Sequence, residues 1–157
     1  EAGAGLIVTD IDAKKVEKVV RDFAASAVAP EEIYDTDADV FAPCGLGGVI
    51  NDETIKRLKV EVVAGGANNQ LLEPRHGGAL AAREILYAPD YPANAGGVIN
   101  GCRDLLGWEP SQAATKVDQI YDTLLNIFQL ANREGIPTYK AADRLAEQRL
   151  DHGVNAI

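Results

Sequence analysis

The chain has 157 residues and a mass of 16.7 kDa, with 46% hydrophobic and 25% charged residues, which predicts one folded domain rather than a disordered chain. Its net charge of −9 argues against a nucleic-acid-binding surface, and no uncharged stretch approaches the roughly 20 apolar residues of a membrane span. Two cysteines, Cys44 and Cys102, are too few for a disulfide framework or a four-cysteine zinc site.

Strand-like and helical patterns alternate in the first third of the chain. Residues 6–9 form a short β-branched run that predicts a buried strand. Valines at helical spacing then predict an amphipathic helix over 13–25, with Asp12 as its N-cap. The remaining elements expected here are a strand at 27–28, a helical turn at 30–33 and a strand at 40–42.

The same alternation continues through the middle of the chain. A short helix, opened by Asn51 or Asp52, is expected to run through residue 58. Further on we expect strands at 60–64 and 85–88 and helices at 74–83 and 95–106. The pentapeptide GGVIN occurs twice, at 47–51 and 96–100, each time after a strand that ends in Ala-Pro. These are two similar strand-to-helix turns, which in a parallel sheet lie at the carboxyl edge, where ligands bind.

The C-terminal part contains the clearest helical stripe, from Ala113 to Ala131. This helix is expected to end near Glu134, with Gly135 as its C-cap, and a last helix follows over 140–150. Strands that alternate with helices predict an α/β fold with a parallel sheet, here with additional C-terminal helices.

Asp10 directly follows the first strand. In dinucleotide-binding folds an acid after the second strand accepts hydrogen bonds from the adenosine ribose and favours NAD over NADP. The alternative role is that of a helix-capping residue. No glycine-rich fingerprint precedes it, because Gly3-Ala4-Gly5 leads into a strand rather than out of one. Since the chain also has no Met, we expect it to belong to a longer protein that supplies the first strand and helix.

Two further loops contain candidate binding residues. The small residues around Cys44 and Gly45 would let a cofactor approach the backbone, unless this is only a tight turn. Cys44 is expected to be a passive thiol, either buried or facing the cofactor. Asn68, Asn69 and Gln70 offer uncharged donors and acceptors for a ribose or carboxamide, the alternative being an Asn-rich turn satisfied by its own backbone.

The loop after the strand at 85–88 contains Asn94, whose amide could face a substrate. It also contains Asp90, which could act as a base but which we expect to brace the turn. His76 and His152 are expected to be structural or solvated. No nucleophile–base set, paired carboxylates or metal-ligand spacing stands out.

Together these loops resemble the C-terminal, NAD-binding half of the Glu/Leu/Phe/Val amino-acid dehydrogenases, and especially the leucine dehydrogenases. The segments that carry the resemblance are VTDID (8–12), DVFAPCGLGGVINDETI (39–55), AGGANNQLLEPRHG (64–77), YAPDYPANAGGVIN (87–100) and GIPTYKAADRLAEQR (135–149). The resemblance implies a Rossmann-type NAD-binding domain, lacking its first βα unit, in residues 1–134. Residues 135–157 would form a helix that returns towards a catalytic domain outside this chain.

The implied reaction is the NAD-dependent oxidative deamination of a leucine-like L-amino acid to a 2-oxo acid, ammonia and NADH. The implied cofactor-binding residues are Asp10 at the adenosine ribose, Cys44 and Gly45 between adenosine and nicotinamide, and Ala67, Asn68 and Asn69 at the nicotinamide ribose and carboxamide. The implied substrate-binding residues are Asn94 near the amino group and Leu124 and Ile127 in the side-chain pocket. The family's catalytic lysine, carboxylate-binding lysine and catalytic aspartate belong to its N-terminal domain, so no catalytic residue and no activity are expected of this chain alone.

Alternatives remain for the function. The substrate could instead be an aromatic amino acid, or the chain could be a non-catalytic nucleotide-binding module. A purely structural domain is the third possibility. We further expect a cytoplasmic protein, because no signal peptide precedes the first strand. The resemblance also implies a homo-oligomer that assembles through the absent domain.

Overall fold

The computed structural model describes residues 3–154, and the side chain of His152 lies outside this description. The elements in chain order are β1 (Ile7–Val8), α1 (Ala13–Phe23), β2 (Ser26–Ala27), the 3-10 turn η1 (Ile33–Asp35), β3 (Val40–Phe41), α2 (Thr54–Arg57), β4 (Val62–Val63), α3 (Arg75–Ala82), β5 (Leu86–Tyr87), α4 (Asp90–Ala93), α5 (Gly96–Leu106), α6 (Pro110–Glu134) and α7 (Thr138–Val154). The expected α/β class with parallel strands and C-terminal helices is confirmed.

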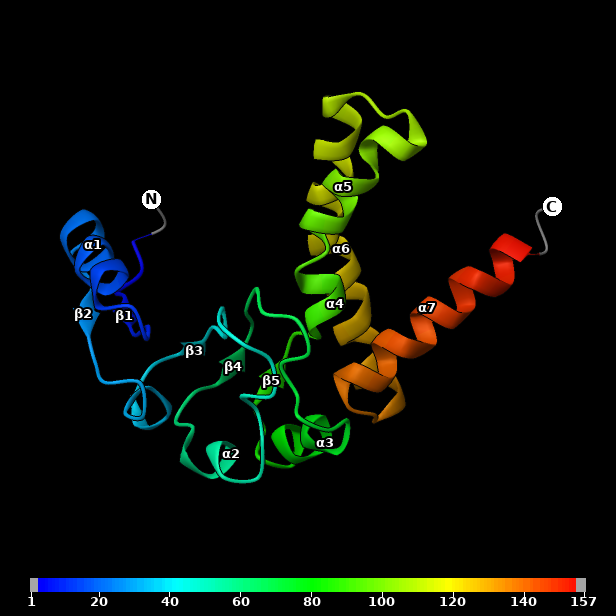
Figure 1. Cartoon of the computed structure of the whole chain (residues 1–157). Coiled ribbons are helices and arrows are strands. Elements are labelled where there is room, and N and C mark those ends of the chain that lie inside the picture. The colour runs from blue at the N-terminus through cyan, green and yellow to red at the C-terminus, as the bar shows by residue number, and fades with distance from the viewer. Residues whose placement is uncertain (1–2, 155–157) are drawn as a thin grey trace.

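The strands form two parallel sheets within the described residues. β1 pairs with β2, and β3, β4 and β5 form a three-stranded sheet in that order. Figure 1 shows β1, β2 and α1 together at one end of the molecule. The prediction that the first strand is buried is wrong, since Leu6 and Ile7 are 42% and 39% exposed. A strand with one neighbour and helix cover from α1 alone keeps much of its surface in contact with solvent.

The main hydrophobic core lies against the three-stranded sheet. Its buried residues are Ile50, Ile55, Leu58, Val63, Leu80, Ile85 and Tyr87, contributed by the strands and by α2, α3 and their flanking loops. Each such aliphatic side chain stabilises the fold by about 1.5–3 kcal/mol when buried. This core holds the carboxyl ends of β3, β4 and β5 at one edge.

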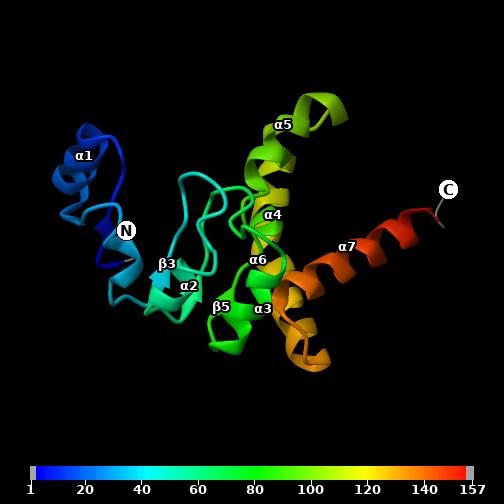
Figure 2. The ribbon, with the colours of Figure 1, turned by 60° about the horizontal axis from the view of Figure 1, so that its bottom comes forward.

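The C-terminal helices pack on one another and on the loops beside that edge. α5 and α7 both contact α6, and Figure 2 shows α7 leading away from the sheet. As expected, α6 ends at Gly135, which has a φ of +64°. A second core joins α6 to α7 through Ile127, Leu130, Ala131, Ala141 and Ala142. None of the helices within residues 3–154 is long and apolar enough to cross a membrane.

Candidate functional site

Three loops meet at the carboxyl edge of the β3–β4–β5 sheet. They follow β3 at residues 42–48, β4 at 64–70 and β5 at 88–94. The first two touch so closely that a Cβ on Gly65 would collide with the backbone of Pro43, and a Cβ on Gly47 would lie 2.7 Å from the carbonyl oxygen of Asn68. Glycine at these positions is therefore required by contact between loops.

The amides of two of these loops form a cluster. Nδ2 of Asn94 donates a hydrogen bond of 2.6 Å to Oδ1 of Asn68. It also lies 3.3 Å from the carbonyl oxygen of Ala67 and 3.4 Å from that of Gly66. Asn68 and Asn69 are exposed, Asn94 is half-buried and Ala67 is buried. The loop after β4 is thus not satisfied by its own backbone alone, since the next loop provides a partner for Asn68.

Gln70 differs from its neighbouring amides because it is fully buried. Its Nε2 donates to the carbonyl oxygens of Gly65 at 2.8 Å and Ala67 at 3.0 Å. Asp90 braces this loop from the next one, as expected, by accepting the N–H of Gln70 at Oδ2 and that of Tyr91 at Oδ1. The sequence alone does not show that Gln70 is buried while the two asparagines before it are exposed. The only signal that could have indicated its burial is the apolar Leu-Leu pair that follows it.

Two tyrosines in the loop after β5 and in β5 itself, Tyr91 and Tyr87, have raised pKa values. Burial, and then the negative charge of Asp90, raise the pKa of Tyr87 above its ordinary value. Burial also raises the pKa of Tyr91, whose hydroxyl donates a hydrogen bond of 3.0 Å to Asp143. Both phenols therefore stay protonated at neutral pH.

Asp10, Cys44 and Gly45 are all exposed. Asp10 follows β1 in the two-stranded sheet, so it does not belong to the three-loop cluster. Its Oδ1 accepts the N–H of Asp12 at 2.8 Å, while Asp12 itself caps α1 as expected, through the N–H of Lys14 at 3.0 Å. The prediction of a buried Cys44 is wrong, and its alternative, a thiol that faces a cofactor, remains open.

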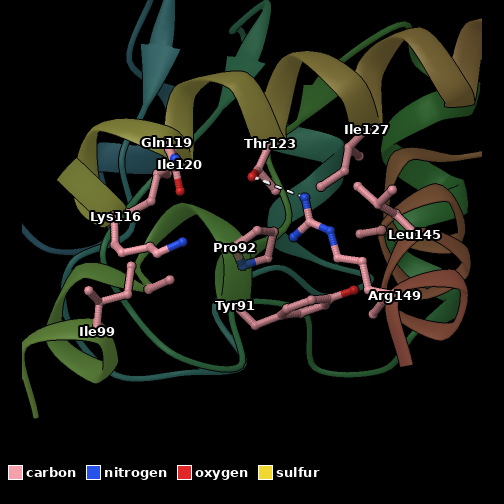
Figure 3. A pocket seen from close by; sticks show the side chains of 13 residues that line it. Tyr91, Pro92, Ile99, Lys116, Gln119, Ile120, Thr123, Ile127, Leu145 and Arg149 are labelled. Carbon is pink, nitrogen blue, oxygen red and sulfur yellow. Dashed lines mark hydrogen bonds between the residues drawn. The ribbon is translucent and has the colours of Figure 1, made fainter. Parts of the chain in front are cut away.

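A cavity of about 440 Å³ lies between α4, α5, α6 and α7 (Figure 3), and its lining includes Ala95, the residue that follows Asn94. Ile127, which is 1% exposed, forms part of its wall together with Pro92 and Leu145. Arg149 donates to the hydroxyl of Thr123 across one side. Leu124 does not line this cavity and packs instead against the second core. The mostly apolar wall suits an apolar side chain.

A polar cluster around His76 holds α2 against α3. His76 is fully buried, its Nδ1 accepts the N–H of Glu73, and its Nε2 lies 3.3 Å from Oδ1 of Asp52. Arg75 binds both carboxylate oxygens of Asp52, at 2.7 and 2.6 Å, and these hydrogen bonds lower the pKa of Asp52 to about 2. The prediction of a structural His76 is consistent with this arrangement.

Comparison with known proteins identifies the same family along nearly the whole chain. The sequence model described as Glutamate/Leucine/Phenylalanine/Valine dehydrogenase matches residues 5–154. Leucine dehydrogenase of Thermoactinomyces intermedius is 56% identical over 149 residues, which are 95% of this chain and 41% of that protein. Phenylalanine dehydrogenase of Caldalkalibacillus thermarum is 47% identical, over 94% of this chain and 41% of its own.

A solved structure agrees with the sequence comparisons. The crystal structure of L-tryptophan dehydrogenase from Nostoc punctiforme superposes with a TM-score of 0.92 at 47% identity, over 96% of this chain and 46% of that chain. The chain thus spans about two fifths of the length of the curated relatives it matches.

Proposed function

Because the chain belongs to the Glutamate/Leucine/Phenylalanine/Valine dehydrogenase family, we propose that it is the NAD-binding part of an L-amino-acid dehydrogenase. The full-length enzyme converts a leucine-like branched-chain amino acid, NAD and water to a 2-oxo acid, ammonia and NADH. The observation that carries the proposal is the amide cluster of Asn68 and Asn94 at the carboxyl edge of a parallel sheet.

The chemistry of this edge fits a dinucleotide. The glycines at 47 and 65 let the loops after β3 and β4 lie in direct contact, so both loop backbones can border one ligand at this edge. The exposed amides of Asn68 and Asn69, above the buried Ala67, offer uncharged partners to a ribose and a carboxamide. At the other sheet, Asp10 has Oδ2 without a hydrogen bond to any residue from 3 to 154, so it can accept from ribose hydroxyls. Cys44 and Gly45 would border the part of the dinucleotide that runs from Asp10 to the amides of Asn68 and Asn69.

Asn94 is suited to orient the substrate. Three oxygens of the neighbouring loop occupy Nδ2, so Oδ1 is the atom that the amide presents as an acceptor. An acceptor suits the N–H groups of an amino acid. A bound nicotinamide would supply the hydride acceptor, and Ile127 in the cavity wall would supply apolar surroundings for the substrate side chain. Leu124 would act from behind this wall, because it packs against the second core, which contains Ile127. The catalytic acid–base groups are proposed to come from outside residues 1–157.

The main alternative is an aromatic substrate. It is favoured by the similarity to a phenylalanine dehydrogenase and to an L-tryptophan dehydrogenase. The other alternative is a module that binds a nucleotide without turnover. The cluster of Asn68 and Asn94 could bind a nucleotide in that case as well.

One set of assays on the full-length protein separates these functions. NADH binding is measured by nicotinamide fluorescence, and NADH production is followed with L-leucine, L-phenylalanine and L-tryptophan. The proposal predicts binding together with the highest kcat/KM for L-leucine. A preference for an aromatic amino acid selects the first alternative, and binding without turnover selects the second. No NADH binding at all would overturn the proposal.

A further inference from the structure

Asp90 joins two loops that the sequence separates by 20 residues. Its Oδ2 accepts the backbone N–H of Gln70 at 3.0 Å, and its Oδ1 accepts that of Tyr91 at 2.9 Å. Its own N–H donates to the hydroxyl of the buried Tyr87 at 3.3 Å. Both carboxylate oxygens are therefore engaged by backbone groups, one in each loop.

Gln70, on one side of this connection, controls the shape of the loop after β4. Its carbonyl oxygen accepts the N–H of Ile50 at 3.0 Å, and its side chain holds the carbonyls of Gly65 and Ala67. Asn69, directly before it, has a left-handed φ of 51°. A displacement of Gln70 would therefore move Asn68 and Asn69.

Asn94, on the other side, is the C-cap of the short helix α4, which begins at Asp90. The backbone N–H of Asn94 donates to the carbonyl oxygen of Asp90 at 2.8 Å, which closes the turn of α4. Asp90 thus has direct hydrogen bonds to the backbone of both segments that contain the asparagines. It makes no hydrogen bond to Asn68 or to the side-chain amide of Asn94.

We propose that Asp90 is a positioning residue, whose carboxylate sets the spacing between the loops after β4 and β5 and so keeps the Asn94 amide directed at Asn68. This inference rests on the proposed function for its kinetic consequence, because the two asparagines are the residues proposed to orient cofactor and substrate. The effect of Asp90 on the reaction is geometric, since both of its carboxylate oxygens accept backbone N–H groups of the protein.

The test uses the full-length protein and three variants. Asp90→Asn keeps the size but presents one acceptor oxygen, so one of the two N–H groups loses its partner. Asp90→Glu keeps the charge but moves the carboxylate away by one methylene. Asp143→Asn is the matched control. It removes one negative charge that contacts Tyr91, the neighbour of Asp90 in α4, but Asp143 makes no hydrogen bond to Gln70.

We expect both Asp90 variants to lower kcat by about 10-fold or more, since small misplacements of positioning groups have effects of this size. KM for the amino acid should change by less than a factor of about 3, and Asp143→Asn should keep kcat within twofold of the parent. A wild-type kcat in Asp90→Glu would show that charge alone matters and would overturn the proposal. So would loss of thermal stability in both variants with kcat unchanged.

A structural readout keeps this inference separate from the proposed function. In crystal structures of the ligand-free parent and Asp90→Asn proteins, the Asn94–Asn68 distance of 2.6 Å should lengthen beyond hydrogen-bond range in the variant. An unchanged distance contradicts the positioning role even if the parent is an active dehydrogenase. A lengthened distance supports it even if the parent neither binds nor reduces NAD.

Discussion

Asn94 and Asn68 lie 26 residues apart in the chain, yet their side chains share a hydrogen bond of 2.6 Å at the edge of the sheet. The bond fixes which end of the Asn94 amide faces the protein and which faces outwards. Removing the amide should therefore affect binding and turnover more than folding.

For Asn94→Ala, we expect kcat/KM for the amino acid to fall by about 10–100-fold, equivalent to about 1.4–2.7 kcal/mol of transition-state stabilisation. The melting temperature should change little, because the residue is only half-buried. Steady-state kinetics of the full-length enzyme measure the effect. Asn100→Ala, an exposed asparagine of α5, serves as the control and should be fully active.

Gly65→Ala should destabilise the protein. A Cβ at this position collides with the backbone of Pro43, so the two loops must separate, at a cost of about 1–3 kcal/mol in the free energy of unfolding. Gly78→Ala in α3 is the matched substitution, because a Cβ there meets no atom within 4 Å. It should be neutral or stabilising by about 0.5–1 kcal/mol. Equal effects of the two changes in urea unfolding would contradict the close contact of the loops.

Asp52 should make stability depend on pH in the acid range. Its pKa is about 2 in the folded protein, below the ordinary value of 3.8, chiefly because Arg75 donates hydrogen bonds to it. A carboxylate with a lowered pKa contributes stability above its unfolded pKa, and this contribution is lost as pH falls from about 4 towards 2.

Unfolding by urea at several pH values between 2 and 5 measures this contribution. Asp52→Asn should have a flatter pH profile in that interval than the parent. Asp118→Asn, which removes an exposed carboxylate without an ion pair to residues 3–154, should keep the parental slope. If both variants have the parental slope, the Arg75 pair has no role in acid stability.

Asp10→Ser tests the proposed contact with the adenosine ribose. Loss of the carboxylate removes charge-assisted hydrogen bonds worth about 1.5–3 kcal/mol, so NADH affinity should fall by about 10-fold or more. Discrimination against NADPH should fall as well, because the repulsion of a 2′-phosphate disappears. Asp12→Ser removes an equal charge nearby but keeps an N-cap residue, so it should leave both affinities unchanged. Fluorescence titration with NADH and NADPH gives the comparison.

The sequence allowed the helices to be predicted better than the sheets. The apolar stripe and the glycine at position 135 defined α6 closely, because both signals are local. The short helix α4 was missed, since Pro92 suggests a turn. A proline in the first turn of a helix gives up an N–H that has no helical partner there, which explains why α4 tolerates it. The division of the strands into two sheets depends on distant pairing and left no local signal.

The candidate site shows the same division between local and distant information. The polar loops after β4 and β5 were predicted from glycines and amides next to strand ends. The direct contact between Asn68 and Asn94 was not, because it depends on how Gly65 and Asp90 bring separate loops together. Cys44 was misjudged as a possible buried thiol because its neighbours are apolar or small, although its loop extends into solvent.

The division into two sheets has a consequence for how the protein would respond to its ligand. β1, β2 and α1 contact mainly one another, so little packing connects their opening to that of the β3–β4–β5 sheet. A dinucleotide that touches both Asp10 and Asn68 would connect the two sheets, and its binding free energy would oppose their separate opening. Amide hydrogen exchange would then slow most in β1 and β2, and cofactor binding would convert two loosely coupled folding units into one cooperative unit.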